Sequence, residues 1–307
     1  MQVLLIGDTI LDIYTYGKAL GLSSETPTIV ARKGAVQHNL GGAALVCRNL
    51  LELGAMVRFV TLVGDDDEAR HVRGFEADRL EVLAVTDVHR PTTVKHRFWV
   101  DGYKLFQLDT RDDAPIPEVL AESVLAKVDS CLAESNVVVI SDYRHGLLTP
   151  NLLAKLMPRL RKAGKPVYVD SQVAQNASNH LCYSGGAVMC LNLKEARAID
   201  PQFEPAQNVG ALAVLAQALD TNSIAVKLGD EGALMLSGRQ VAHVPASKVR
   251  AVDPTGAGDA FLSALCLAGL SDPDAALRIA NAWAGLSVEI HGTAPPKRSD
   301  LIRLLGV

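Results

Sequence analysis

The chain has 307 residues, 49% of which are hydrophobic, and its 30 basic and 34 acidic residues give a formal net charge of −4. This length and composition predict one large folded α/β domain, or one domain with a small appendage, and argue against a disordered chain. A weakly acidic chain without a basic block is not expected to bind nucleic acid or anionic lipid through its net charge. Small anions must therefore be bound by a local site.

Cysteine usage and the first residues bear on the cellular compartment. The five cysteines are scattered, and the lack of a C-x-x-C pair argues against zinc or redox chemistry and for buried thiols in a reducing cytoplasm. They are Cys47, Cys131, Cys182, Cys190 and Cys266. The chain starts directly with an apolar strand, and no apolar run approaches about 18 residues, so we expect neither a signal peptide nor a membrane span.

Short β-prone apolar runs alternate with helical patterns, which predicts a doubly wound, mostly parallel sheet. The predicted strands lie near residues 3–6, 57–63, 137–140, 167–169, 188–191 and 224–227. One predicted helix covers residues 43–53 and ends at Gly54. Two more open at Thr149-Pro150, running to residue 160, and at Asp272-Pro273, because a capping residue followed by proline is typical of a helix start.

Two stretches, residues 14–40 and 92–109, have β-prone sequence without intervening helices. We expect them to form a small separate sheet, a lid, within a single domain that spans residues 1–307. Such a lid would cover a substrate and exclude water, or it would form the interface of a homodimer, and one surface can do both.

The most informative stretch is residues 252–261, which reads V-D-P-T-G-A-G-D-A-F. Gly256, Ala257 and Gly258 have small or absent side chains, so their backbone N–H groups can converge on an anion at the start of the helix that follows. Asp259 falls in the first helical turn, where we expect the helix dipole to keep it ionised and ready to accept a proton from a hydroxyl group. This combination predicts phosphoryl transfer.

Simpler alternatives exist for the same stretch. Glycine-rich turns and first-turn aspartates often serve only as turns and caps. A dinucleotide-binding G-x-G-x-x-G motif would need glycine where Phe261 stands, and the Walker A pattern occurs nowhere in the chain. A phosphate site here would therefore belong to neither of these two types.

The segment Asn192-Leu-Lys-Glu195 follows a predicted buried strand and opens a helix. As N-x-x-E it satisfies a helix capping box, which is one interpretation. The other is that Asn192 and Glu195 hold Mg²⁺ on the nucleotide phosphates, directly or through water, since Mg²⁺ prefers oxygen ligands and keeps several waters.

Acidic and glycine residues near the first strand suggest an acceptor site. Asp8 and Asp12 follow that strand, and open α/β sheets bind ligands at this end of their strands. Carboxylates suit sugar hydroxyls, although solvated loop acids would look the same. Gly41 and Gly42 precede a helix and allow close backbone approach, which helix packing alone would also explain.

Two further segments have both a structural and a functional interpretation. Lys227, Gly229 and Gly232 fall in a turn after a strand, which is either a hairpin loop or a nucleotide-contacting loop. Lys95 and Arg97 alternate along a lid strand and so share a face, where they would clamp a substrate phosphate or remain solvated charges.

Taken in this order, the motifs resemble the ribokinase-like (PfkB) carbohydrate kinases over essentially the whole chain, and residues 252–261 match the second signature of that family closely. Within the family, the chain is most similar to members that phosphorylate D-glycero-D-manno-heptose 7-phosphate at its anomeric hydroxyl. This narrower likeness rests on residues 7–17, 40–44, 90–97, 108–109, 141–143 and 192–195.

The resemblance implies ATP and Mg²⁺ as cofactors, a sugar or sugar phosphate as substrate, and Asp259 as the catalytic base. It implies an anion hole at Gly256, Ala257 and Gly258, a nucleotide site that includes Asn192, Glu195, Lys227, Gly229, Gly232, Asp253 and Asn281, and a substrate site that includes Asp8, Asp12, Gly41, Gly42, Lys95, Arg97 and Asp142. Asn281 would lie beside the adenine, and the family admits a monovalent cation near Asp253.

The sequence departs from the family pattern on the acceptor side. Leu45, Ile13 and Gln107 replace an asparagine and two arginines, and Ser171-Gln172 stands where Asp-Pro-Lys is usual. The acceptor therefore stays open among a heptose phosphate, another sugar or sugar phosphate, and a nucleoside. A non-catalytic sugar-sensing protein is the alternative from another class. Bifunctional relatives carry a second, nucleotidyl-transferring domain, which we do not expect in 307 residues.

Overall fold

A computed structural model describes residues 1–173, 178–207 and 209–306. Its main feature is a nine-stranded sheet with the order β13-β12-β11-β10-β9-β8-β1-β4-β5. The strands are β1 (Gln2–Gly7), β4 (Met56–Val63), β5 (Leu80–Thr86), β8 (Val137–Asp142), β9 (Val167–Ser171), β10 (Val188–Asn192), β11 (Ser223–Lys227), β12 (Ala233–Ser237) and β13 (Gln240–Val244). Pairing is parallel from β5 to β11, and β12 and β13 close one edge with antiparallel pairs.

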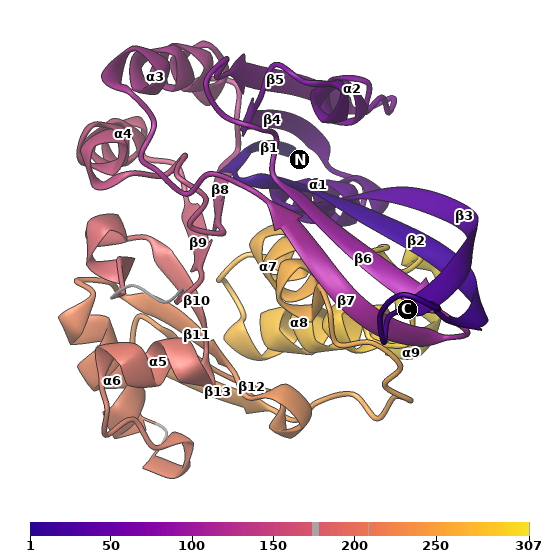
Figure 1. The fold of residues 1–307 in the computed structure, drawn as a ribbon. Helices are drawn as coiled ribbons and strands as arrows, with labels where there is room; N and C mark the ends of the chain where they lie inside the picture. Colours follow the sequence, from indigo (N-terminus) through magenta and orange to yellow (C-terminus); the bar gives the residue numbers. More distant parts are fainter. Residues whose placement is uncertain (174–177, 208, 307) are drawn as a thin grey trace.

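Helices cover both faces of this sheet (Figure 1). One face carries α1 (Ala43–Glu52), α7 (Ala257–Ala268), α8 (Pro273–Ser287) and α9 (Arg298–Leu305). The other carries α3 (Glu118–Leu132), α4 (Pro150–Ala163), α5 (Leu193–Ile199) and α6 (Val209–Ala218). The short helix α2 (Asp67–Arg73) contacts β5 and β2, and single 3-10 turns occupy Pro205–Gln207, His180–Tyr183 and Gly229–Glu231.

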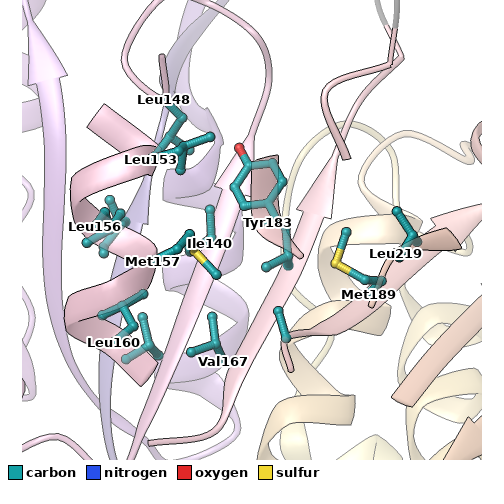
Figure 2. Packing of buried hydrophobic residues seen from close by; sticks show 14 of the residues in the cluster. Ile140, Leu148, Leu153, Leu156, Met157, Leu160, Val167, Tyr183, Met189 and Leu219 are labelled. Atoms are coloured by element: carbon teal, nitrogen blue, oxygen red, sulfur yellow. The ribbon is translucent and has the colours of Figure 1, made fainter. Parts of the chain in front are cut away.

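The two cores follow from the alternation of side chains along the strands. In β1, Leu4 and Ile6 belong to the core under α3 and α4, whereas Val3 and Leu5 belong to the core under α1 and α7. Figure 2 shows the first core, where leucines of α4 pack toward Ile140 of β8. Because both faces are covered, the strands are almost continuously apolar, which is the pattern that the sequence displays.

The lid is a four-stranded sheet with the order β3-β2-β6-β7, and it stands away from the nine-stranded sheet (Figure 1). Its strands are β2 (Thr9–Leu22), β3 (Ile29–Gly42), β6 (Val94–Val100) and β7 (Tyr103–Thr110). Only Asp8 separates β1 from β2, and α1 follows β3 directly, so the lid is continuous with the main sheet at its base. The predicted fold class, a doubly wound sheet with a small β-sheet lid, is confirmed.

Two smaller expectations can be compared with the structure. Four of the cysteines are buried and all five are free thiols, but Cys182 is half-exposed, contrary to the expectation of buried thiols throughout. Within the described ranges, no helix has the length and apolar character needed to cross a bilayer.

Candidate active site

The carboxyl ends of β8 to β11 meet the N-terminus of α7 at one edge of the sheet. Gly256 is the N-cap residue of α7, with φ 85°, a left-handed conformation that glycine adopts without strain. Ala257 begins the helix, and Gly258 and Asp259 complete its first turn. The expected glycine turn at a helix N-terminus is therefore present, with a carboxylate beside it, and the N–H of Ala257 donates to the Pro254 carbonyl oxygen at 3.2 Å. Anion binding by this nest remains a prediction.

Space around the two glycines is tightly limited. A Cβ atom on Gly256 would lie 2.5 Å from Cδ2 of Leu45, and one on Gly258 would lie 3.4 Å from Nζ of Lys227. Leu45, which replaces the asparagine of the family pattern, is itself buried in α1. An apolar side chain thus supports the nest from one side, while an ammonium group lies close to the other.

Asp259 is 9% exposed, and both of its carboxylate oxygens accept a hydrogen bond from the Tyr143 hydroxyl, at 2.7 and 2.8 Å. Burial raises its pKa to about 7, with a further increase from the nearby Asp170 and a decrease from Tyr143 and Lys227. The helix dipole is therefore not sufficient to hold the pKa of Asp259 at its usual low value, contrary to the expectation that it keeps this group ionised. Desolvation outweighs it, and the group titrates near neutral pH.

A polar cavity of about 270 Å³ opens in front of Asp259. Its wall includes Tyr143, Asp170, Asn192, Glu195, Lys227, Gly256 and Gly258. Lys227, at the end of β11, forms an ion pair with Asp170 of β9, and both side chains are more than four-fifths buried. Two strands, β9 and β11, and two helices, α5 and α7, therefore bring charged groups of both signs to a single cavity.

The capping-box interpretation of Asn192 and Glu195 is correct. Asn192 Oδ1 accepts the backbone N–H of Glu195 at 2.9 Å, and Glu195 Oε2 accepts that of Asn192 at 2.7 Å. Glu195 nevertheless lines the cavity, and burial, with Asp170 nearby, raises its pKa to about 7. Glu195 is a buried carboxylate with a raised pKa that lies near the carboxylate of Asp170, so the pair can also bind a cation.

On the lid side, Asp12 and Arg97 form a buried ion pair between β2 and β6. The Arg97 guanidinium lies 5.2 Å from the centre of the Tyr14 ring, and the Thr293 hydroxyl donates to Asp12 Oδ2 at 3.4 Å. A Cβ on Gly41 would lie 2.2 Å from the same oxygen, so a larger residue there would displace the Asp12 carboxylate.

Lys95 and Arg97 both extend from β6 toward site residues, which agrees with their predicted common face. Lys95 Nζ lies 6.0 Å from the centre of the Tyr143 ring. Arg97, however, is already paired with Asp12, so the two cations are not a free clamp.

Asp8 and Asp142 lie deeper than the sequence suggests. Asp8 is 3% exposed and accepts the backbone N–H of Tyr143 at 2.9 Å, and its pKa rises to about 7 because of burial and the neighbouring Asp142. Asp142 accepts hydrogen bonds from the side chains of Ser171, Asn179 and Tyr183 and from the backbone of residue 144. Its oxygens are engaged within the protein and organise the loop, and sugar contact remains a prediction for it.

The remaining predicted nucleotide residues lie around the edge of the site. Gly229 and Gly232 have φ values of 67° and 97° and form the tight turn of the β11–β12 hairpin. The Asn281 amide donates to the carbonyl oxygens of Val244 and Pro245, which ties α8 to the end of β13. These contacts account for the residues structurally, and nucleotide contact remains a prediction for them.

Asp253 precedes the nest and holds two loops together. Its carboxylate accepts the backbone N–H groups of Thr255 at 3.0 Å and of Gly292 at 3.1 Å. Nothing in these contacts tests whether a monovalent cation binds nearby.

Sequence reasoning missed the roles of Tyr143 and Asp170. Tyr143 was noted only as part of a resemblance, although its hydroxyl is the direct partner of Asp259. Asp170 is the penultimate residue of the parallel strand β9, and its place near the carboxyl end of a strand is the signal that could have identified it.

The model of the pfkB family carbohydrate kinases matches residues 1–300. The chain belongs to this family. It is therefore an ATP-dependent carbohydrate kinase, and Asp259 with the glycine turn before it lies within the matched residues. The expected enzyme class, a phosphotransferase acting on an alcohol group of a sugar, is confirmed.

Curated relatives narrow the comparison. The pfkB chain is 35% identical to the bifunctional protein HldE of Bradyrhizobium diazoefficiens and 32% identical to that of Paramagnetospirillum magneticum. Each alignment covers 98% of this chain but only 62% of the relative. The chain thus spans less than two thirds of the length of these proteins.

Solved structures confirm the ribokinase-like fold. Arabidopsis thaliana ribokinase, complexed with ribose and ATP, matches with a TM-score of 0.73 and 21% identity, covering 99% of this chain and 98% of that one. Phosphofructokinase-2 from Escherichia coli, in complex with potassium, matches with a TM-score of 0.79 and 19% identity, covering 99% and 97%.

Proposed function

We propose that this pfkB kinase transfers the γ-phosphoryl group of ATP to a hydroxyl of a sugar phosphate, and that the acceptor is D-glycero-D-manno-heptose 7-phosphate at its anomeric hydroxyl. The observation that carries the kinase chemistry is the buried Asp259 beside the α7 nest, at the mouth of a polar cavity. The relatives named HldE and the sequence likeness described above support the heptose acceptor.

In the proposed reaction, Asp259 accepts the proton of the acceptor hydroxyl while the backbone N–H groups of Gly256 and Gly258, on either side of Ala257, stabilise charge on the moving phosphoryl group. Because the transition state of phosphoryl transfer is loose, positioning and electrostatics contribute more than basicity. A pKa near 7 suits a group that must be ionised before the reaction and protonated after it.

The donor set fits Mg²⁺ bound with the nucleotide. Across the described ranges, no group of three or more His, Cys, Asp or Glu side chains could hold a metal ion alone. The protein would supply two buried carboxylates, Glu195 and Asp170, and phosphate oxygens and water would supply the other ligands of the ion. When bound, Mg²⁺ would neutralise phosphate charge, and Asn192 would act on it only through water because its side-chain oxygen is used in the capping box.

A panel of acceptors tests this function. The purified chain is incubated with Mg-ATP and a mixture of free sugars, sugar phosphates and nucleosides, and products are identified by mass. A single phosphate added to heptose 7-phosphate is expected. Phosphorylation of another acceptor would support the kinase activity but contradict the heptose acceptor. The buried Leu45, which replaces an asparagine on the acceptor side, is a reason to test for this outcome. No ADP release with any acceptor would overturn the proposal.

Tyr143→Phe should shift the pH dependence of turnover. The Tyr143 hydroxyl stabilises ionised Asp259, and its removal leaves burial to raise the Asp259 pKa further. We expect the acidic limb of the kcat profile to move to higher pH by about 1–2 units, in keeping with one hydrogen bond to a charged group. Tyr183→Phe, which removes a hydroxyl bonded to Asp142 instead, is the control and should leave that limb in place.

We also propose that the lid forms a homodimer interface. Its strands expose large apolar side chains, namely Leu20, Leu22, Ile29, Val30, Tyr103, Phe106 and Leu108. Placing a charge in such a surface should separate the subunits. Leu108→Glu is expected to sediment as a monomer where the wild type sediments as a dimer, whereas Val119→Glu, on the exposed face of α3, should not change the sedimentation coefficient. A monomeric wild type would contradict the interface.

A further inference from the structure

One ammonium group, that of Lys227, lies against the nest at the start of α7. Its Nζ is 3.4 Å from the place that a Cβ of Gly258 would take, and its side chain is only 16% exposed. The same amine is paired with Asp170 across the intervening strand β10. A cation this close to converging N–H groups adds its full charge to their partial charges.

Acidic side chains surround this ammonium group. Asp170 is its ion-pair partner, and the buried Glu195 and Asp259 line the same cavity. The site thus places three carboxylates near the buried Lys227, whereas an ion pair that serves only the fold would need one.

We propose that Lys227 is a catalytic residue that binds the transferring phosphoryl group, and that Asp170 holds its ammonium in place until nucleotide binds. This inference rests on the proposed function. The bond between the γ-phosphorus and the bridging oxygen breaks, ADP leaves with that electron pair, and the acceptor oxygen forms the new bond while its proton goes to Asp259. Lys227 donates hydrogen bonds to the phosphoryl oxygens throughout and neither gains nor loses a proton.

The experiment compares Lys227→Met with Lys227→Arg, using ADP plus aluminium fluoride as a mimic of the moving phosphoryl group. Lys227→Met should lower kcat roughly 10²–10³-fold, the typical cost of removing one group that stabilises transition-state charge. Its affinity for ADP alone should stay within about threefold, while its affinity for ADP with aluminium fluoride falls together with kcat. Lys227→Arg keeps the charge and should recover much of both, and the exposed Lys248→Met is the matched control.

A purely structural role makes a different prediction, because Lys227→Met leaves the buried Asp170 unpaired. The double variant Asp170→Asn with Lys227→Met removes that unpaired charge. We expect it to regain thermal stability but not affinity for the aluminium fluoride complex. Recovery of both, or a Lys227→Met enzyme with wild-type kcat, would overturn the assignment of Lys227. Failure of the proposed function would look different, since the wild type itself would then release no ADP.

Discussion

Asp259→Asn is expected to lower kcat by roughly 10²–10⁴, the usual range for loss of a general base, while ATP still binds. The substitution keeps the shape of the side chain and its capacity to accept a hydrogen bond from Tyr143, so the loss would report on proton acceptance. Initial rates of ADP release and nucleotide binding measured by calorimetry would test this. Turnover equal to the wild type would refute the role of Asp259.

Asp274→Asn is the matched control. Asp274 also lies in the first turn of a helix, α8, but it is exposed and lies outside the signature segment. The same chemical change there should leave kcat unaltered. A comparable loss in both variants would mean that helix-terminal charge in general, rather than the Asp259 carboxylate, limits the reaction.

Asp259→Asn should also change how the free energy of unfolding depends on pH. Since burial raises the Asp259 pKa from 3.8 to about 7, the folded state holds this proton more tightly than the unfolded state between those values. The contribution of Asp259 to the free energy of unfolding therefore falls as pH rises from about 4 to about 7. Asp259→Asn should remove this dependence, so that its melting temperature exceeds that of the wild type at pH 8 but not at pH 4.

Gly256→Ala is expected to lower kcat by roughly 10²-fold, comparable to loss of an oxyanion-stabilising donor. The new methyl group would lie 2.5 Å from Leu45 Cδ2, and a left-handed backbone with a side chain costs about 1–2 kcal/mol. Both effects push the turn out of the conformation that directs its N–H groups at one point. Steady-state kinetics and thermal unfolding would be measured together.

Gly269→Ala separates the two effects of Gly256→Ala. Gly269 ends α7 with φ 77°, and nothing lies within 4 Å of the place its Cβ would take. Its substitution should cost stability through the backbone alone and leave kcat unchanged. If Gly256→Ala lost stability to the same extent and kept full activity, the nest would have no part in catalysis.

Much of the scaffold was predictable because strand and helix signals are local. Apolar runs bounded by turns located the central strands, and the pairs Thr149-Pro150 and Asp272-Pro273 located the starts of α4 and α8. The lid was recognisable because β-prone residues continued without the helix that a parallel crossover needs.

The charged contacts of the site were not predictable in the same way. The pairs Arg97–Asp12 and Lys227–Asp170 join residues 85 and 57 positions apart, so no local spacing reveals them. The pKa of Asp259 depends on how completely α7 and Tyr143 exclude water, which is a property of packing. Asp142 looked available for a sugar because its three side-chain partners lie up to 41 residues away.

The junction of the lid with the main sheet couples the two halves of the site mechanically. β2 leaves the sheet after Asp8 and β3 returns at Gly42, where the N–H of Ala43 donates to the Asp8 carbonyl at 2.9 Å. Asp12 and Gly41 lie on the lid side of this hydrogen bond, whereas Asp259 lies on the side of the nine-stranded sheet. The acceptor-side groups and the base therefore lie on opposite sides of one junction, so the angle at which the lid leaves the sheet sets the gap that a sugar must fill.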